Sequence, residues 1–267
     1  MAIDFNLVIP SRDGLPHVFL IAREYVRLDL APHYFVDGRS SGLFRGTAPR
    51  LLAHTTLLSP TGASIEEMLP EIVARTSAPW VLRIDDDEAP SLALRTWLAD
   101  VTPAADKTVI AFPRRAVRFD EGAPVYARSI PKLTEYDYQY RAFRRASAVF
   151  DPTLHTAGIR FSGTQVVYAP PDCCLYHFDW IVRTRAQREA KLFHYESLKH
   201  GSWDSFDFQY LPEDFSAALY DYTPLDDPEI ARLAKRLRLA QRLHGFARRM
   251  AGLSPVRIPR PARHAAP

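Results

Sequence analysis

Short apolar runs alternate with helical stripes over the first hundred residues. Strands are predicted at residues 5–11, 33–38, 51–58 and 81–84. Residues 18–27 and 64–77 carry apolar side chains at helical spacing, and Ser64 followed by Glu67 has the form of a capping box. Strands that alternate with helices predict βαβ units with right-handed crossovers around a mainly parallel sheet.

The pattern changes in the second half of the chain. A further strand is predicted at 108–113, and residues 114–180 mix short strands with turns, which indicates a half that closes over a pocket. A long helix follows from residue 228, where Ile230, Leu233, Leu237 and Leu243 form an apolar stripe among Arg and Lys side chains. We expect the Pro- and Arg-rich tail, 253–267, to be flexible.

Composition narrows the class of protein. The chain has 267 residues, of which 47% are hydrophobic and 24% charged, which is typical of a folded globular protein. The net charge of +3 is small and is concentrated beyond Glu229. The basic helix could therefore dock on an anionic membrane, or its stripe could pack on the core. The low net charge argues against a nucleic-acid partner.

The two cysteines, Cys173 and Cys174, are adjacent. This spacing fits neither an ordinary disulfide nor a CxxC zinc site, so we expect a reducing compartment. No apolar run approaches 18 residues, and no basic segment precedes an apolar one at the N-terminus. The expected location is the cytoplasm, with peripheral contact at the inner face of the membrane through the basic helix.

Three consecutive carboxylates, Asp85, Asp86 and Asp87, end one predicted strand. In open α/β sheets, ligands bind beyond the carboxyl ends of the strands. Alternate carboxylates can face one divalent cation and leave positions for substrate phosphates, so the triplet predicts phosphate-donor chemistry. The alternative is a structural turn or helix cap, where Asp is also common.

The order of the motifs resembles a glycosyltransferase of the GT-A fold, most closely the large family two of inverting enzymes, over about residues 4–215. The segments that carry this resemblance are Ile9-Pro10-Ser11-Arg12, Val36-Asp37-Gly38-Arg39-Ser40, the Asp-X-Asp motif Asp85-Asp86-Asp87, and Leu175-Tyr176-His177-Phe178-Asp179-Trp180. The resemblance implies an α/β fold with a GT-A-like (Rossmann-like), mainly parallel central sheet flanked by helices, with a C-terminal basic helical extension.

The resemblance also implies an activity and a division of the chain. The activity is metal-dependent transfer of a sugar from a nucleoside-diphosphate sugar to a glycan or lipid-linked acceptor, with inversion. The catalytic domain would span 1–227, with a nucleotide-sugar-binding half at 1–113 and an acceptor or closing half at 114–227. The basic amphipathic helix would span 228–252.

Residue roles follow from the same resemblance. Asp37 would receive the base or ribose of the donor, and Asp86 would face the ribose or the protein. Asp85 and Asp87 would hold Mn²⁺ or Mg²⁺, with His177 as a third ligand to the metal or diphosphate. For each the structural alternative is a turn, a cap or a buried partner. Further donor contacts are expected from Pro10, Ser11, Arg12 and Arg83, with Arg183, Arg185, Arg188 and Lys191 as a secondary phosphate site.

The catalytic base is not fixed by any motif. Inverting transfer needs a group that takes the proton of the acceptor hydroxyl. Candidates are Asp151 and His155 in one segment, and Glu135 or Asp137 in a tyrosine-rich stretch whose rings could stack on a sugar or belong to the core. Relatives place an acid after the aromatic or histidine residue, whereas Thr156 follows His155 here.

Two other functions fit parts of the pattern. A sugar nucleotidyltransferase also combines strand-end acids with Mg²⁺, but it usually has a Gly-rich loop and a lysine after the first strand, where this chain has Pro10-Ser11-Arg12-Asp13-Gly14. A catalytically silent nucleotide-sugar-binding module of a polysaccharide assembly complex would bind the donor without turnover.

Overall fold

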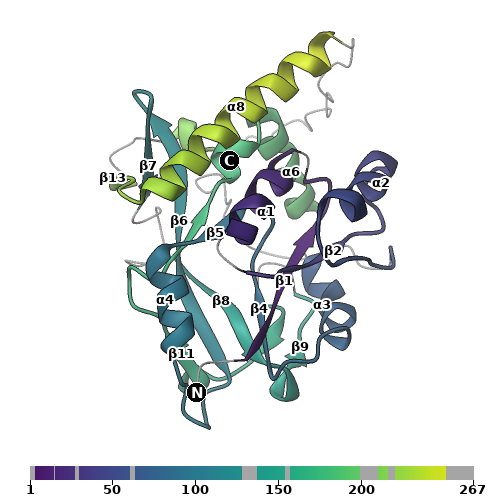
Figure 1. Ribbon diagram of the computed structural model, residues 1–267, viewed down its shortest axis with the longest axis vertical. Helices are drawn as coiled ribbons and strands as arrows, with labels where there is room; N and C mark the ends of the chain where they lie inside the picture. The colour runs from purple at the N-terminus through teal and green to yellow at the C-terminus, as the bar shows by residue number, and fades with distance from the viewer. Residues whose placement is uncertain are drawn as a thin grey trace, which may run out of the picture.

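The computed structural model describes residues 4–14, 16–27, 30–60, 64–127, 137–153, 157–198, 210–215 and 220–250; the side chains of 26–27, 194–198 and 246–250 are outside this description. At its centre lies a curled sheet with the strand order β13-β7-β6-β8-β4-β1-β2-β3 (Figure 1). The strands are β1 (Phe5–Ser11), β2 (His33–Val36), β3 (Thr55–Leu57), β4 (Trp80–Arg83), β5 (Glu88–Pro90), β6 (Val109–Asp120), β7 (Ala123–Ala127), β8 (Asp137–Arg144), β11 (Val166–Tyr168), β12 (Leu175–His177) and β13 (Tyr222–Pro224).

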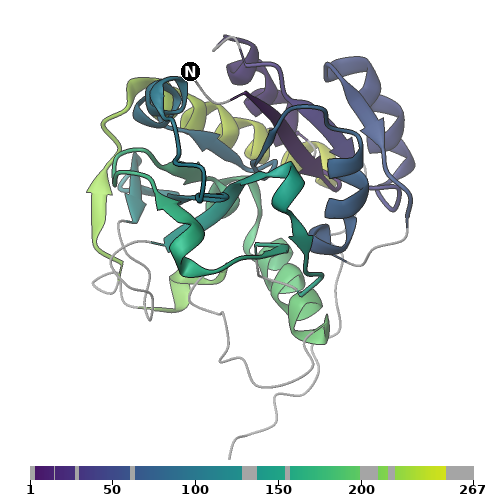
Figure 2. The same cartoon turned by 90° about the horizontal axis from the view of Figure 1, so that it is seen from below.

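Helices cover both faces of this sheet (Figures 1 and 2). They are α1 (His17–Arg27), α2 (Gly42–Leu51), α3 (Ile65–Ala74), α4 (Leu92–Asp100), α5 (Asp179–Val182), α6 (Arg185–Leu198) and α8 (Pro228–Met250). One buried cluster joins the strands to α1, α4, α5 and α8, and a second joins the opposite face to α3 and to a small ribbon, β9 (Val149–Phe150) with β10 (Ile159–Arg160). The expected α/β architecture with flanking helices is confirmed.

Strand direction differs between the two halves. β3, β2, β1 and β4 are parallel neighbours, as the βαβ pattern predicts. Beyond β4 the sheet is mixed, because β8 runs antiparallel to both β4 and β6, and β6 turns back into β7. The β6–β7 turn consists of Glu121 and Gly122 with φ of 44° and 89°, the left-handed backbone that a two-residue hairpin favours.

The helices that were not predicted from the sequence include α2 and α4. The predicted strand at 51–58 is shorter, because Leu51 ends α2 and only Thr55–Leu57 pair with β2. Ser41 begins α2 by accepting the Phe44 amide at 3.3 Å, yet Gly46 and Pro49 lower its helix propensity. Ser91 begins α4 in the same way. At α3 the predicted cap is present, since Ser64 accepts the Glu67 amide at 3.4 Å.

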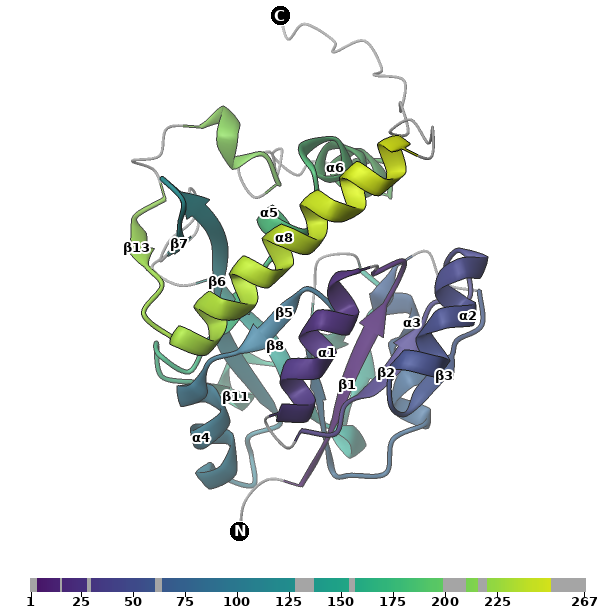
Figure 3. The ribbon, with the colours of Figure 1, turned by 45° about the horizontal axis from the view of Figure 1, so that its top comes forward.

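The C-terminal helix packs on the core. Ile230, Leu233 and Leu237 of α8 belong to the same buried cluster as β1 and α1, and α8 crosses the sheet beside α1 (Figure 3). Leu243, in the same predicted stripe, is 59% exposed. Among the described side chains of α8, the stripe therefore faces the core in the first turns of the helix. The predicted tail, 253–267, lies outside the described residues.

Two further sequence expectations concern membranes and thiols. Among the described residues, no helix combines the length and apolar character needed to cross a membrane. Cys173 and Cys174 are both free and buried. Burial raises the pKa of the Cys174 thiol to about 11.

Candidate functional site

The carboxyl ends of β1, β2 and β4 open into a cleft of about 1020 Å³. Apart from the predicted secondary phosphate site, every predicted site residue that the structure describes lines this cleft. They are Pro10, Ser11, Arg12, Asp37, Arg83, Asp85, Asp86, Asp87, Asp137, Asp151 and His177. The other two base candidates, Glu135 and His155, lie outside the described residues. The fold thus brings together side chains from both halves of the chain, as expected for a ligand site at strand ends.

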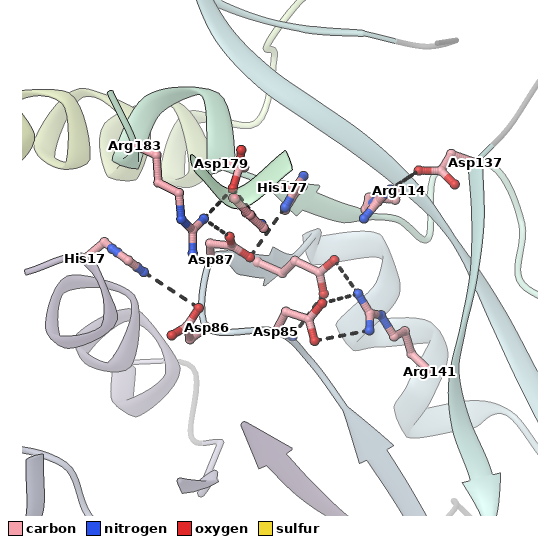
Figure 4. A network of polar contacts seen from close by, with 12 residues as sticks. His17, Asp85, Asp86, Asp87, Arg114, Asp137, Arg141, His177, Asp179 and Arg183 are labelled. Carbon is pink, nitrogen blue, oxygen red and sulfur yellow. Dashed lines mark hydrogen bonds and ion pairs between the residues drawn. The ribbon is translucent and has the colours of Figure 1, made fainter. Parts of the chain in front are cut away.

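The three consecutive aspartates turn toward three different partners (Figure 4). Asp85 accepts two hydrogen bonds from Arg141, at 3.1 and 2.5 Å. Asp86 accepts the Ser11 hydroxyl at 2.5 Å and lies 3.7 Å from His17 Nε2. The Asp87 side chain turns away from the partners of Asp85 and Asp86, toward His177 of β12 and the segment that follows this strand.

Arg141 holds Asp85 in a buried clamp. Its guanidinium also donates to Glu88 at 2.9 Å, and Glu88 in turn accepts the Asp85 amide at 3.1 Å. Glu88 has no exposed surface. Burial raises the pKa of Asp85, but the nearby Arg141 and Arg83 outweigh it and hold the pKa below its usual range. The Asp85 oxygens are therefore engaged with arginine in this arrangement.

Asp87, His177 and Asp179 form a cluster whose ligand atoms all lie within 4.8 Å of one another. The antiparallel pairing of β12 with β5 sets His177 opposite Glu88, and the Phe178 amide donates to the Asp87 carbonyl at 2.8 Å. The sequence prediction named Asp87 and His177 but not Asp179. Asp85, predicted as a metal ligand, is not part of this cluster.

The chemistry of this cluster fits a divalent cation. Asp179 Oδ2 is buried and accepts no hydrogen bond from the described residues, so one oxygen is left with unfilled acceptor capacity, which a buried carboxylate rarely has. Two carboxylates and one imidazole are a donor set that suits Mn²⁺, and carboxylate oxygens also suit Mg²⁺.

Two basic side chains adjoin the same carboxylates. Arg183, directly after α5, forms ion pairs with both Asp87 and Asp179. Lys191 of α6 donates to Asp179 at 2.9 Å. Burial raises the pKa of Asp179, but Lys191 and Arg183 outweigh it and lower the pKa; His177 and Arg183 do the same for Asp87. Both carboxylates are therefore ionised at neutral pH.

The other cations of the predicted phosphate site point elsewhere. Arg185 pairs with Asp214 at 2.6 Å, and Arg188 donates to the Tyr210 carbonyl at 2.7 Å. Neither lines the cleft, whereas Arg183 and Lys191 do. The two ends of the basic run, Arg183 and Lys191, are thus the cations that reach the carboxylates of the cluster.

Asp37 lies at the end of β2 with almost no exposed surface. It accepts the backbone amide and the guanidinium of Arg39, both at 2.8 Å, and lies 3.7 Å from Arg12. These contacts outweigh the effect of burial and lower the pKa of Asp37. The arrangement leaves an ionised carboxylate at the cleft wall beside two arginines.

A glycine permits the contact between β1 and the triplet. A Cβ atom at Gly14 would lie 2.6 Å from Asp86 Oδ2 and 2.8 Å from Ser11 Oγ, closer than nonbonded atoms approach. The Ser11–Asp86 hydrogen bond therefore depends on the absence of a side chain at position 14.

The two described base candidates, Asp137 and Asp151, also line the cleft. Asp137 accepts the Arg114 guanidinium at 2.7 Å and the Gln139 amide at 2.6 Å. Asp151 accepts the Thr153 hydroxyl at 2.6 Å and the Thr153 amide at 3.0 Å. The Thr153 hydrogen bonds, with a smaller effect of Arg160, lower the pKa of Asp151. A lowered pKa makes a carboxylate a weaker proton acceptor.

Aromatic rings lie next to these carboxylates. Tyr138, Tyr140 and Phe161 line the cleft, and the rings of Tyr140 and Phe161 are 4.7 Å apart. Tyr138 packs edge-on against Tyr168, with centroids 5.0 Å apart. Rings of this kind give a flat apolar surface on which a sugar could stack. The tyrosine-rich stretch thus contributes to the cleft wall as well as to the core.

Several residues of the site were missed from the sequence. Asp179 follows His177 by two residues and precedes Arg183 by four, a spacing that puts Asp179 and Arg183 on one face of a helical turn. That spacing was a usable signal. Glu88 and Arg141 gave none, because their pairing spans 53 residues of sequence and depends on β8 lying beside β4.

The fold and the cleft together define an α/β protein with an acidic cluster and adjoining cations at the carboxyl ends of parallel strands. Neither the protein-family models nor the curated proteins contain a match to this chain. Solved structures that it is similar to include residues 1–349 of S. aureus TarS, at 11% identity and a TM-score of 0.45, covering 76% of this chain and 67% of that one.

A longer structure of S. aureus TarS is similar at 11% identity and a TM-score of 0.43, covering 80% of this chain but only 44% of that one. A third structure is a mannose-1-phosphate geranyltransferase from Thermus thermophilus, at 18% identity and a TM-score of 0.30, covering 55% of this chain and 58% of that one. Because all three TM-scores lie below 0.5, these likenesses transfer no residue role to this chain.

Proposed function

We propose that this protein is a metal-dependent glycosyltransferase that moves a sugar from a nucleoside-diphosphate sugar to a glycan or lipid-linked acceptor, with inversion. The observation that carries the proposal is the Asp87–His177–Asp179 cluster with Arg183 and Lys191 beside it. A carboxylate–imidazole group with adjoining cations is suited to a metal-bound diphosphate, since both the metal and the basic side chains attract its oxygens.

Each wall of the cleft has a role in this proposal. A bound Mn²⁺ or Mg²⁺ would stabilise the negative charge that develops on the leaving diphosphate. Asp87, His177 and Asp179 would hold it, while Arg183 and Lys191 exchange their carboxylate partners for phosphate oxygens. Asp37 and the β1 end would bind the nucleoside, and the tyrosine wall would face the sugar and acceptor. In this arrangement Asp85 supports the site through Arg141.

The first test is calorimetric binding of UDP, GDP, CDP and dTDP with and without Mn²⁺. We expect one diphosphate to bind in a Mn²⁺-dependent manner, and an Asp87→Asn, Asp179→Asn double variant to lose this binding. An Asp85→Asn variant should weaken metal binding far less than the double variant. The matched control is Asp100→Asn on the exposed end of α4. Unchanged diphosphate binding in the double variant would overturn the metal assignment.

Turnover of the sugar nucleotide identified in this way separates an enzyme from a silent binding module. Asp137→Asn and Asp151→Asn then assign the base among the described candidates. The variant that keeps donor affinity but loses roughly 10²–10⁴-fold in kcat identifies the residue that accepts the acceptor proton. If both variants retain full kcat, the base lies at another position, and Glu135→Gln and His155→Ala are the next variants.

A further inference from the structure

The C-terminal helix has a second face that points away from the core. At 3.6 residues per turn, five exposed positions between residues 232 and 243 gather within about 100° of helix rotation. We define this outward face by Arg232, Lys235, Leu239, Arg242 and Leu243, all of which are exposed. The buried residues Ile230, Leu233, Ala234 and Leu237 lie on the opposite side of the helix. The outward face is therefore separate from the buried side of the helix, and it includes Leu243, which the sequence pattern places in the apolar stripe.

Two leucines are exposed on this face. Leu239 is 58% exposed and Leu243 is 59% exposed, and their spacing of four residues makes them neighbours one turn apart. Single exposed leucines are ordinary on a protein surface. A pair of leucines with three exposed cations beside it is the pattern of a helix that lies in a membrane interface.

The cations of the outward face differ from the other cations of α8. Arg236 is paired with Glu24 of α1 at 2.5 Å, and Arg238 stacks on Phe119 with its guanidinium carbon 4.1 Å from the ring centroid. Within the described residues, no ion pair or ring contact involves Arg232, Lys235 or Arg242. Among the described side chains of α8, the exposed Arg and Lys residues are thus the ones near the two leucines.

An apolar groove continues this surface toward α1. It encloses about 460 Å³, and Arg236 lies at its border with α8. Its apolar lining includes Phe19, Ala22, Leu30, Leu51 and Leu52. Leu51, at the end of α2, is 61% exposed. The groove offers an apolar recess next to the outward face, large enough for a segment of an acyl chain.

We propose that the outward face of α8 docks on an anionic phospholipid surface. The two leucines insert among the upper acyl carbons, and Arg232, Lys235 and Arg242 contact phosphate groups of the lipids. A second copy of the chain is a poorer partner, because a two-fold interface would set this cationic face against the same cationic face of the other copy. Nucleic acid would leave the leucines without a partner.

The proposal stands apart from the glycosyltransferase assignment, since it rests on no residue of the cleft. The two assignments are related in one respect: a lipid-linked acceptor would be reached at the same surface.

Co-sedimentation of the full chain with vesicles tests the docking. One set of vesicles is phosphatidylcholine, and the other is an equal mixture of phosphatidylcholine and phosphatidylglycerol. We expect binding to the anionic vesicles only, weakening as salt is added. Each cation near such a surface contributes about a fivefold gain in partitioning. The Arg232→Gln, Lys235→Gln, Arg242→Gln variant should therefore lose on the order of 100-fold, and Leu239→Ser with Leu243→Ser at least about tenfold.

Matched controls remove equally exposed groups elsewhere. Leu92→Ser on α4 removes a leucine that is 61% exposed, and Arg75→Gln after α3 removes a cation that is 50% exposed. Both should bind vesicles like the parent chain. Asp87→Asn with Asp179→Asn should also keep full vesicle binding, so loss of catalysis and loss of docking are distinguishable.

Three results would overturn the proposal. They are equal binding to neutral and anionic vesicles, unchanged binding by the folded leucine variant, and a dimer in sedimentation velocity that Leu239→Ser dissociates. Circular dichroism and the Tm of each variant verify the fold, which should persist because the substituted side chains are outside the core.

Discussion

At the scale of single residues, the Asp85-Asp86-Asp87 triplet does not act as one unit. Asp85 is clamped by Arg141, Asp86 is bonded to Ser11, and Asp87 joins the acidic cluster. The strand pattern predicts where the triplet lies, because an apolar run that stops at polar residues marks a strand end. It does not predict which way each carboxylate turns, since that depends on residues from distant strands.

The Arg141 clamp leads to a stability prediction. Replacing Arg141 with Met should lower the free energy of unfolding by about 3–5 kcal/mol, because Asp85 and the fully buried Glu88 lose their shared cation. Urea unfolding measures the change. The control, Arg75→Met, breaks an exposed pair with Glu71 and should cost less than about 1 kcal/mol. A similar small cost for both variants would contradict a structural role for the clamp.

The clamp also sets a pH dependence. The folded-state pKa of Asp85 lies below the ordinary value of 3.8, so its contribution to stability is fully present above about pH 4 and is lost as pH falls through the lowered value. The Arg141→Met variant should lose most of this dependence. Acid unfolding of the parent chain and the variant, followed by circular dichroism, compares the two.

At the scale of elements, the predicted pieces of the first half are present and those of the second half are only partly recognisable. The local signals are strong for four of these elements: β1, β2 and β4 are short apolar runs, and α3 begins with a capping residue. α2 was missed because few of its residues are apolar and it contains Gly46 and Pro49. α4 has six apolar residues among nine, but five of its positions are exposed and its buried residues are Leu94 and Leu98, so the pattern shows no continuous stripe. The short strands β5 and β12 are extended because they pair with each other. No local sequence pattern predicts that pairing.

The β9–β10 ribbon depends on one glycine. Gly158 has a φ of +75°, and a Cβ atom there would lie 2.1 Å from Leu69 Cδ1 of α3. We expect Gly158→Ala to destabilise the protein by about 1–3 kcal/mol, since Leu69 is fully buried and has little room to move. Thermal unfolding measures the effect.

A glycine in another element serves as the control for the Gly158→Ala variant. Gly46 lies within α2 and a Cβ there would meet no atom within 4 Å, so Gly46→Ala should stabilise the protein by about 0.5–1 kcal/mol. If Gly158→Ala leaves the Tm unchanged, the ribbon does not need its close approach to α3.

At the scale of the whole molecule, α8 is part of the fold and not an appendage. The division at residue 227 follows the change in composition, yet the apolar residues Ile230, Leu233 and Leu237 complete the cluster beneath β1 and α1. Periodicity alone predicts a stripe without naming its partner, so the sequence left docking on a membrane and packing on the core open. The structure supports packing for the first turns.

Truncation distinguishes the contributions of α8 and the tail. Deleting residues 228–267 removes three large buried side chains, those of Ile230, Leu233 and Leu237, worth roughly 5–9 kcal/mol together, comparable with the whole stability of a typical domain. We expect this variant to be unfolded or aggregated, whereas deletion of 251–267 should keep the Tm within a few degrees. Circular dichroism decides, and a folded, cooperative protein ending at 227 would show that residues 1–227 fold independently of α8.

The two adjacent free cysteines can report local opening of the protein. Cys173 and Cys174 are buried in the main cluster next to β12, and the raised pKa of Cys174 keeps that thiol protonated at neutral pH. A maleimide reagent can label them only in molecules that have opened around β12, the strand that presents His177 to the acidic cluster. The rate of labelling in native buffer would therefore time the local opening of the site without an engineered probe.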